Sequence, residues 1–354
     1  MLMVCLLSGS VFLLVSFSTG DTPVNGENLR QLYAKPPAEW PAPHVQQGVS
    51  WSELGAVPPH PLAGKTDSLA ALIELGKVLF FDTRLSESGK ISCASCHDPA
   101  LNWTDGKARS TGHEGAITAR NAPTIQNSWF YKKLFWDGRA RNLADQAFAP
   151  IVSESEMHSE MPLVMQKLRR SEYYPRQFEK AFGSKGIDPD RMTEAIAAFE
   201  KTVSSAPSRF DAFLSGDKYA LTNAELRGLH LFRTKAGCIN CHNGPLLTDN
   251  LFHNSGFSGN DAGLYKVTHN EEDRGKIKTP SLRDVARTGP WMHDGAEKEL
   301  AAIIEKYNQA AFPAGTDPLL KPLGLSARDR KDLLQFLRAV SAPPLPFTKP
   351  AQPR

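Results

Sequence analysis

The sequence has few cysteines, no large excess of charge of either sign and few strand-like patterns. Its 354 residues contain five cysteines, and its formal net charge at pH 7 is only +3. A charge this small, without a dense run of Lys and Arg, argues against nucleic acid as a partner. Alternation of apolar and polar residues is weak throughout, whereas helical spacing recurs, so we expect a mainly α fold. The 26 prolines and 26 glycines indicate many turns between short helices.

An apolar run from Leu2 to Phe17 stands at the N-terminus. It is short for a membrane span, and the small and polar residues that follow it are typical of a secretory signal peptide. No Lys or Arg precedes the run, so an uncleaved membrane anchor is the alternative interpretation. We expect a signal peptide over residues 1–20, a periplasmic protein and no stable membrane insertion.

Four of the five cysteines fall in two clusters of identical spacing, and the fifth, Cys5, lies in the N-terminal run. The clusters are Cys93-Ala94-Ser95-Cys96-His97 and Cys238-Ile239-Asn240-Cys241-His242. In this spacing two thiols add to the vinyl groups of one haem, and the adjacent histidine ligates the iron. Zinc is the alternative, but a four-cysteine zinc site typically separates its pairs by about 15–20 residues. Cys96 and Cys238 are much further apart, so the sequence predicts two covalently bound c-type haems, with His97 and His242 as iron ligands.

The chain repeats itself around these clusters. A helical apolar pattern precedes each one, at 76–80 and at 228–232, and the second opens with the capping box of Thr222 and Glu225. We therefore predict two cytochrome c-like haem domains related by an internal repeat. The expected division is a signal peptide at 1–20, an extended Pro-rich arm at 21–65, a first haem domain at 66–205, a second at 206–345 and a tail at 346–354.

The repeat also aligns Pro150 with Tyr307, because each stands twelve residues after a matching glycine, Gly138 or Gly295. Proline cannot bind a metal ion, whereas the phenolate of tyrosine is a known haem ligand. We expect the first haem to be open to a small molecule and the second to be closed by Tyr307. This asymmetry suggests one iron for chemistry and one for storing or relaying oxidising equivalents.

Gln146 and Glu156 lie near Pro150 in the sequence. Splitting a peroxide requires moving a proton from one oxygen to the other, which a carboxylate such as Glu156 performs as base and then acid. An amide such as Gln146 holds the peroxide in line. The alternative for Glu156 is a solvated charge in its serine-rich acidic run.

Two further side chains have a functional and an ordinary interpretation. His113 stands in a glycine-containing stretch and would cap the first iron at rest, or else it is a surface histidine. Trp136 would lie between the haems and carry electrons, or else it packs in the core.

These residues resemble those of the bacterial di-haem cytochrome c peroxidases and of the related protein MauG, over roughly residues 70–345. The motifs that carry the resemblance are 91–99, 120–124, 135–140, 156–157, 278–283 and 293–295. The resemblance implies that the N-terminal haem domain is the peroxidatic one and that the C-terminal domain transfers electrons. Glu156 is then the catalytic carboxylate beside Gln146 and Pro150. Trp136 lies between the haems, and His113 blocks the first iron at rest.

The family also implies a calcium site between the haems. The matching positions are Asn121, through its side-chain oxygen, and Thr288 and Pro290, through backbone carbonyls. Ligation by oxygen alone suits that ion.

The residue expected to bind the second haem differs from that of the peroxidases, which usually have a methionine at this position. This chain has Tyr307 there, and MauG also has a tyrosine. A thioether favours ferrous iron and a high potential, while a phenolate favours ferric iron and lowers the potential. Met292 is a second candidate ligand. The tryptophan that MauG carries two residues before its second cluster is replaced here by Ala236.

The sequence favours the first of three functions, with the other two as alternatives. The first is an exported di-haem peroxidase that reduces hydrogen peroxide to water with electrons from a small cytochrome c or cupredoxin. The second is a MauG-like oxidant that spends peroxide on an aromatic side chain of a partner protein. The third is a di-haem electron carrier without enzymatic activity, which would have no use for Gln146 and Glu156 beside one haem.

Overall fold

The structure is a computed structural model that describes residues 26–309 and 311–353. The predicted signal peptide and Cys5 lie outside these residues. The α-helices are α1 Gly26–Tyr33, α2 Ala70–Phe81, α3 Leu143–Val152, α4 Met161–Arg170, α5 Tyr174–Phe182, α6 Pro189–Glu200, α7 Arg209–Leu214, α8 Asn223–Arg233, α9 Tyr265–Thr268, α10 Leu300–Gln309 and α11 Ala327–Ala339. The strands β1 Phe252–His253 and β2 Ile277–Lys278 form one short antiparallel pair. The fold is mainly helical, as predicted. Across the described ranges, no helix is both long and apolar enough to cross a membrane.

Each half is built on a pair of helices that cross at a glycine. Helix α2 crosses α6, where a Cβ on Gly76 would overlap the carbonyl oxygen of Ala195. Helix α8 crosses α11 in the same way, where a Cβ on Gly228 would overlap the carbonyl oxygen of Asp332. These glycines belong to the two repeated patterns that precede the cysteine clusters. They are required because the backbones approach too closely for any side chain.

The internal repeat persists in the backbone at constant spacing. Asn127 and Asp284 are both left-handed, with φ of 56° and 59°, and each precedes a short 3₁₀ turn. Further along, α3 begins at Leu143 and α10 begins at the equivalent Leu300. Pro150 and Tyr307 therefore occupy the same position on equivalent helices.

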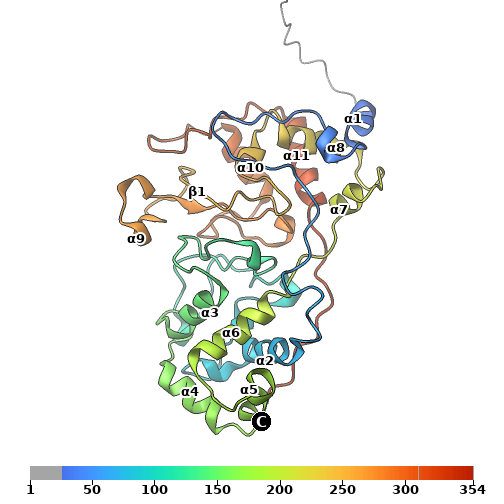
Figure 1. Cartoon of the computed structure of the whole chain (residues 1–354). Coiled ribbons are helices and arrows are strands. Elements are labelled where there is room, and N and C mark those ends of the chain that lie inside the picture. Colours follow the sequence, from blue (N-terminus) through green and yellow to red (C-terminus); the bar gives the residue numbers. More distant parts are fainter. Residues whose placement is uncertain (1–25, 310, 354) are drawn as a thin grey trace, which may run out of the picture.

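The two larger hydrophobic cores of the described residues lie at opposite ends of the molecule, one formed by α2 to α6 and one centred on α8, α10 and α11 (Figure 1). The first contains Phe80, Phe178 and Phe199, and the second contains Phe232 and Phe336. A third, smaller cluster includes Leu134 and Leu143.

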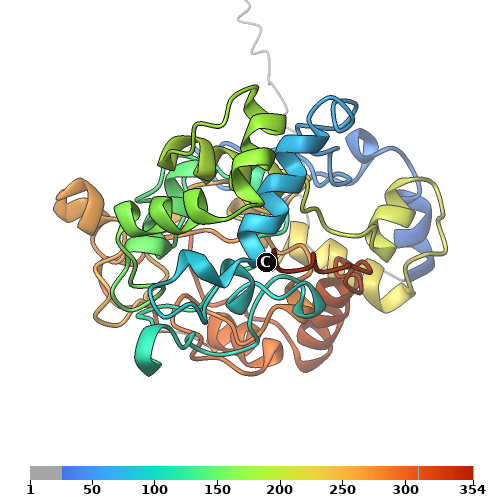
Figure 2. The same cartoon turned by 90° about the horizontal axis from the view of Figure 1, so that it is seen from below.

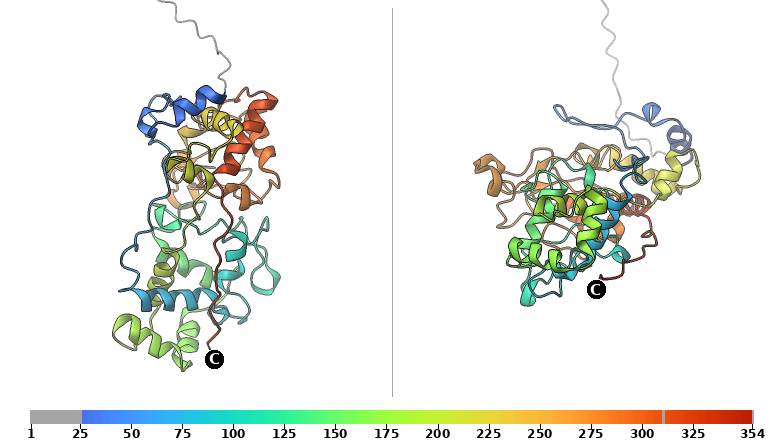
Figure 3. Two further views of the ribbon diagram at one scale, coloured as in Figure 1. Left: turned by 90° about the vertical axis from the view of Figure 1, so that its right-hand side faces the viewer. Right: turned by 60° about the horizontal axis from the view of Figure 1, so that its bottom comes forward.

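The N-terminal arm and the C-terminal tail each pack against the hydrophobic core of the half that is further away in the sequence. The N-terminal arm is not extended throughout, because it contains α1, whose Leu29 and Tyr33 are buried in the second core. The C-terminal tail runs as an extended chain to the first core (Figure 3). There Phe347 stacks on Phe81, with ring centroids 5.5 Å apart, and the chain ends beside α2 (Figure 2).

Candidate active site

A cavity of about 340 Å³ lies in the first half, beside the first cysteine cluster. Its walls come from that cluster, the segment 118–125, the turn 134–139, helix α3 and the loop 153–157. The predicted site residues that line it are Cys93, Cys96, His97, Asn121, Trp136, Gln146, Pro150 and Glu156. Side chains from five separate segments of the chain thus meet in one cavity.

The two cluster histidines are held in the same way. Nδ1 of His97 lies 3.1 Å from the carbonyl oxygen of Trp103, and Nδ1 of His242 lies 3.0 Å from that of Leu247. A carbonyl accepts from a protonated Nδ1, which leaves Nε2 as the metal-binding nitrogen of each ring. Burial also lowers the pKa of both histidines and so favours the neutral, ligating imidazole.

The remaining lining of the cavity suits a haem, which brings an apolar ring and anionic propionates. Cys93 and Cys96 are free thiols. The basic side chains in the walls are Arg120, Arg139, Lys266 and Lys278, of which the two arginines pair with Asp137, a carboxylate that also lines the cavity. Lys278 is 7% exposed, and its Nζ lies 3.3 Å from the centre of the Tyr131 ring. Burial lowers the pKa of Lys278 to about 7. A buried ammonium gains stability from an anion at this wall, so the residues present fit the group.

The distal side chains come from α3 and the loop that follows it. Gln146 and Pro150 are one turn apart on α3, which begins where the side chain of Asn142 accepts a hydrogen bond from Asp145 N. The loop folds back because Met157 N donates to the carbonyl oxygen of Pro150 at 3.1 Å. Glu156 is thereby directed into the cavity. Burial raises the pKa of Glu156, while Arg139 opposes that shift.

Trp136 lies where the two halves meet. Its Nε1 donates to the carbonyl oxygen of Asn121 at 2.9 Å, and its own carbonyl accepts from Lys278 N on β2 at 2.9 Å. Because β2 belongs to the second half, this tryptophan contacts both halves directly.

The residues expected to bind calcium belong to two segments, one from each half, that are connected by a backbone hydrogen bond. The backbone N of Asn121 donates to the carbonyl oxygen of His293 at 2.9 Å, in the segment that begins with Thr288 and Pro290. Nδ2 of Asn121 donates to the carbonyl oxygen of Lys107 at 2.8 Å, which leaves Oδ1 as the free ligand atom.

His113 does not line the cavity. Its Nε2 lies 3.4 Å from Oε2 of Glu87, and its backbone N donates to the carbonyl oxygen of Glu156 at 2.8 Å. The imidazole thus lies behind the wall that carries Glu156 and not over the first cysteine cluster.

Tyr307 is half-buried on α10, near the second cluster. Burial raises its pKa, and the neighbouring thiols of Cys241 and Cys238 raise it further. The ring packs edge-on against Phe257, with centroids 5.3 Å apart. Met292, the other candidate ligand, has φ of 69° in the turn equivalent to the one at Phe135.

Glu200, a buried carboxyl that also lines the cavity, is not among the site residues predicted from the sequence. It is 3% exposed, and its Oε2 has no hydrogen-bond partner among the residues that the structure describes. Burial raises the pKa of Glu200 to about 8. The sequence does contain a sign that Glu200 is buried, because this residue continues the apolar stripe of Met192 and Ile196 at helical spacing.

Comparisons with known proteins agree with this arrangement. A family model described as di-haem cytochrome c peroxidase matches residues 70–219. The cytochrome-c peroxidase IdrP1 of Denitromonas iodatirespirans is 39% identical over 328 residues, covering 81% of this chain and 86% of that protein. The methylamine utilization protein MauG of Methylorubrum extorquens is 39% identical over 300 residues, covering 83% of this chain and 84% of that protein.

A solved structure also matches, that of a MauG-like protein associated with microbial copper homeostasis. Its TM-score is 0.73 at 31% identity, and the match covers 82% of this chain and 95% of the other. The similarity to peroxidases confirms that the protein is an enzyme and an oxidoreductase. The chain belongs to the di-haem cytochrome c peroxidase family.

Proposed function

We propose that this enzyme reduces hydrogen peroxide to water in the cavity beside His97, with Glu156 as the proton-transfer group. The observation that carries the proposal is the position of Glu156, which lines the same cavity as Gln146, Pro150 and His97. Burial raises the pKa of Glu156. A carboxylate with a raised pKa is suited to accept a proton from peroxide and to return it to the departing oxygen.

The other side chains position the substrate and keep the site open. Gln146 offers an amide that holds peroxide or water in line, and Pro150 presents no atom able to bind iron. When bound, the haem supplies the redox chemistry, attached through Cys93 and Cys96 and ligated by His97. Cys238, Cys241 and His242 would hold the second haem in the same way, and Tyr307 is the further side chain proposed to bind its iron.

Electrons arrive one at a time from a small soluble donor, a cytochrome c or a cupredoxin, in the periplasm. Trp136 is the proposed connection, because it bonds to Asn121 in the first half and to Lys278 in the second. A calcium ion at Asn121, Thr288 and Pro290 would hold the same junction together. Its oxygen ligands suit that ion.

The proposed role of Glu156 is tested by comparing Glu156→Gln with Glu154→Gln. Glu154 is exposed in the same loop and serves as the matched control. Peroxide-dependent oxidation of ferrocytochrome c should fall by about 10²–10⁴-fold in Glu156→Gln, as expected for loss of a general acid and base. The control should keep its rate. Equal rates in both variants would remove Glu156 from the mechanism.

A MauG-like activity is the second candidate, favoured by Tyr307 at the position equivalent to Pro150. In this case the two haems would supply the redox chemistry for using peroxide to oxidise an aromatic side chain of a partner protein. Mixing the diferric enzyme with stoichiometric peroxide in the absence of a reductant separates the two functions. A long-lived change in the absorption bands of both haems supports the MauG-like activity, and its absence together with steady cytochrome oxidation supports the peroxidase.

A further inference from the structure

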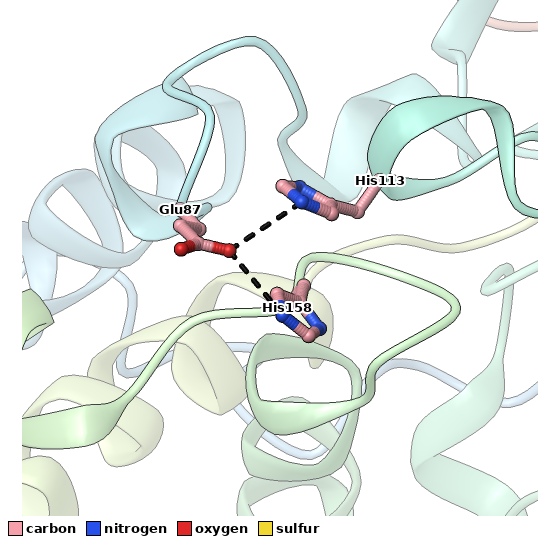
Figure 4. Close-up of side chains that lie close together, drawn as sticks. All are labelled: Glu87, His113 and His158. Carbon is pink, nitrogen blue, oxygen red and sulfur yellow. Dashed lines mark ion pairs between the residues drawn. The ribbon is translucent and has the colours of Figure 1, made fainter.

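Three potential metal ligands converge on the outer side of the cavity wall. Glu87 follows α2, His113 lies in the segment 112–116, and His158 stands two residues after Glu156 (Figure 4). Nε2 of His113 and Nε2 of His158 each lie 3.4 Å from Oε2 of Glu87. All three ligand atoms lie within 4.8 Å of one another.

The spacing suits a metal ion better than hydrogen bonds. A charge-assisted N–H···O bond is about 2.7–2.9 Å long, shorter than either distance here. In a tetrahedral zinc site with bonds of about 2.0–2.1 Å, neighbouring ligand atoms are about 3.3–3.4 Å apart. Both nitrogen–oxygen distances in the cluster have this value. Two imidazoles and a carboxylate are also ligands that zinc accepts.

The two imidazole rings lie face to face, with centroids 4.6 Å apart and planes at 18°. Nδ1 of His113 is buried, and among the described residues it has no hydrogen-bond partner. Only the Nε2 side of that ring therefore has a group to hold it.

The backbone holds the three segments together before any ion binds. Glu87 N donates to the carbonyl oxygen of Met157 at 3.0 Å, and His113 N donates to that of Glu156 at 2.8 Å. Gly112 packs so closely that a Cβ there would overlap the carbonyl oxygen of Ser155. Segments that are already held together lose little backbone freedom when an ion binds, which favours affinity.

We propose that Glu87, His113 and His158 bind one divalent transition-metal ion of the zinc class, and that this ion holds His113 out of the haem cavity. Water or Glu114, whose Oε1 lies 3.9 Å from His113 Nε2, completes the coordination. The proposal that the ion holds His113 out of the cavity rests on the proposed role of His113 as the residue that caps the first iron at rest. A bound ion competes with the haem iron for the same imidazole and so favours the open site.

Binding is tested by calorimetric titration of Zn²⁺ into the holoenzyme in the presence of excess Ca²⁺. The variant His158→Asn is compared with His269→Asn. Both histidines are left-handed, with φ of 48° and 55°, and asparagine tolerates this conformation. His269 is exposed at the end of α9 and is the matched control.

Wild type and His269→Asn should bind one Zn²⁺ per chain at this site, and His158→Asn should bind it at least about tenfold more weakly, or about 1.4 kcal/mol. Glu87→Gln should weaken binding in the same direction. Equal zinc affinity in wild type, His158→Asn and Glu87→Gln would overturn the site.

The effect on His113 has its own readout, the electron paramagnetic resonance spectrum of the diferric enzyme. Zinc should reduce the low-spin signal of the first haem and increase its high-spin signal in wild type, but not in His158→Asn. Zinc binding without this change would overturn the holding of His113 and leave the metal site supported. Neither result depends on Glu156, whose role is decided by the turnover of Glu156→Gln.

Discussion

Glu200 provides the most quantitative test of the haem cavity. Its carboxyl is 3% exposed, lacks a hydrogen-bond partner for Oε2 within the described chain, and has its pKa raised to about 8 by burial. The folded protein therefore keeps the proton at pH 7, whereas the unfolded chain, with the ordinary pKa of 4.5, releases it. Replacement by glutamine removes this ionisation and keeps the shape of the side chain.

The sign and size of the effect follow from the two pKa values. Below pH 4.5 both states are protonated, so the carboxyl contributes no pH dependence. As the pH rises, ionisation favours the unfolded chain by about 1.4 kcal/mol for each pH unit until the folded pKa is reached. At pH 7 the wild type has lost about 3 kcal/mol of stability that Glu200→Gln retains.

The measurement is denaturant unfolding of the holoenzyme at pH 4.5, 6 and 7.5, followed by haem absorbance. Glu194→Gln is the matched control, because Glu194 is exposed on the same helix. The difference between Glu200→Gln and wild type should grow with pH, while that of the control should stay constant. A difference that does not change with pH, or a variant that is less stable at pH 7.5, would show that Glu200 is ionised in the folded protein.

Two further predictions concern the framework around the site. Gly76→Ala should destabilise the first half by about 1–3 kcal/mol, since its Cβ would overlap the backbone oxygen of Ala195 and force α2 away from α6. The shift in the midpoint of denaturant unfolding measures this loss. An unchanged midpoint would mean that the two helices cross less closely than this. Arg233→Ala should cost about 3–5 kcal/mol, because the buried guanidinium binds Glu53, the Tyr33 hydroxyl at 2.9 Å and the Pro41 carbonyl oxygen at 2.8 Å. Limited proteolysis should then cleave the arm within residues 26–65, and resistance equal to wild type would refute this anchoring.

The features that the sequence predicts are those carried by short motifs at fixed spacing. The cysteine clusters predict where each haem is attached. The repeat aligns Pro150 with Tyr307, and the structure places both at the same position of equivalent helices, because equal spacing gives α3 and α10 the same start. The capping box of Thr222 and Glu225 is present as predicted, since all its atoms lie within one helical turn.

Features that depend on distant segments are not predictable in this way. The Pro-rich composition of the arm gives no sign that Tyr33 would bond to Arg233, two hundred residues away. Glu87, His113 and His158 likewise come from three separate loops, and no local pattern relates them. Only folding of the chain determines that these side chains meet.

The position of His113 relative to Glu156 limits how the first haem site can change. Glu156 directs its carboxyl into the cavity, while its carbonyl oxygen accepts the hydrogen bond from His113 N at 2.8 Å. Gly112 packs directly against the preceding residue, Ser155. Movement of the His113 segment toward the iron must therefore either break this hydrogen bond or displace the backbone of Glu156, the residue proposed to transfer the proton. If His113 caps the first iron and the bond is kept, Glu156 is displaced in the closed site.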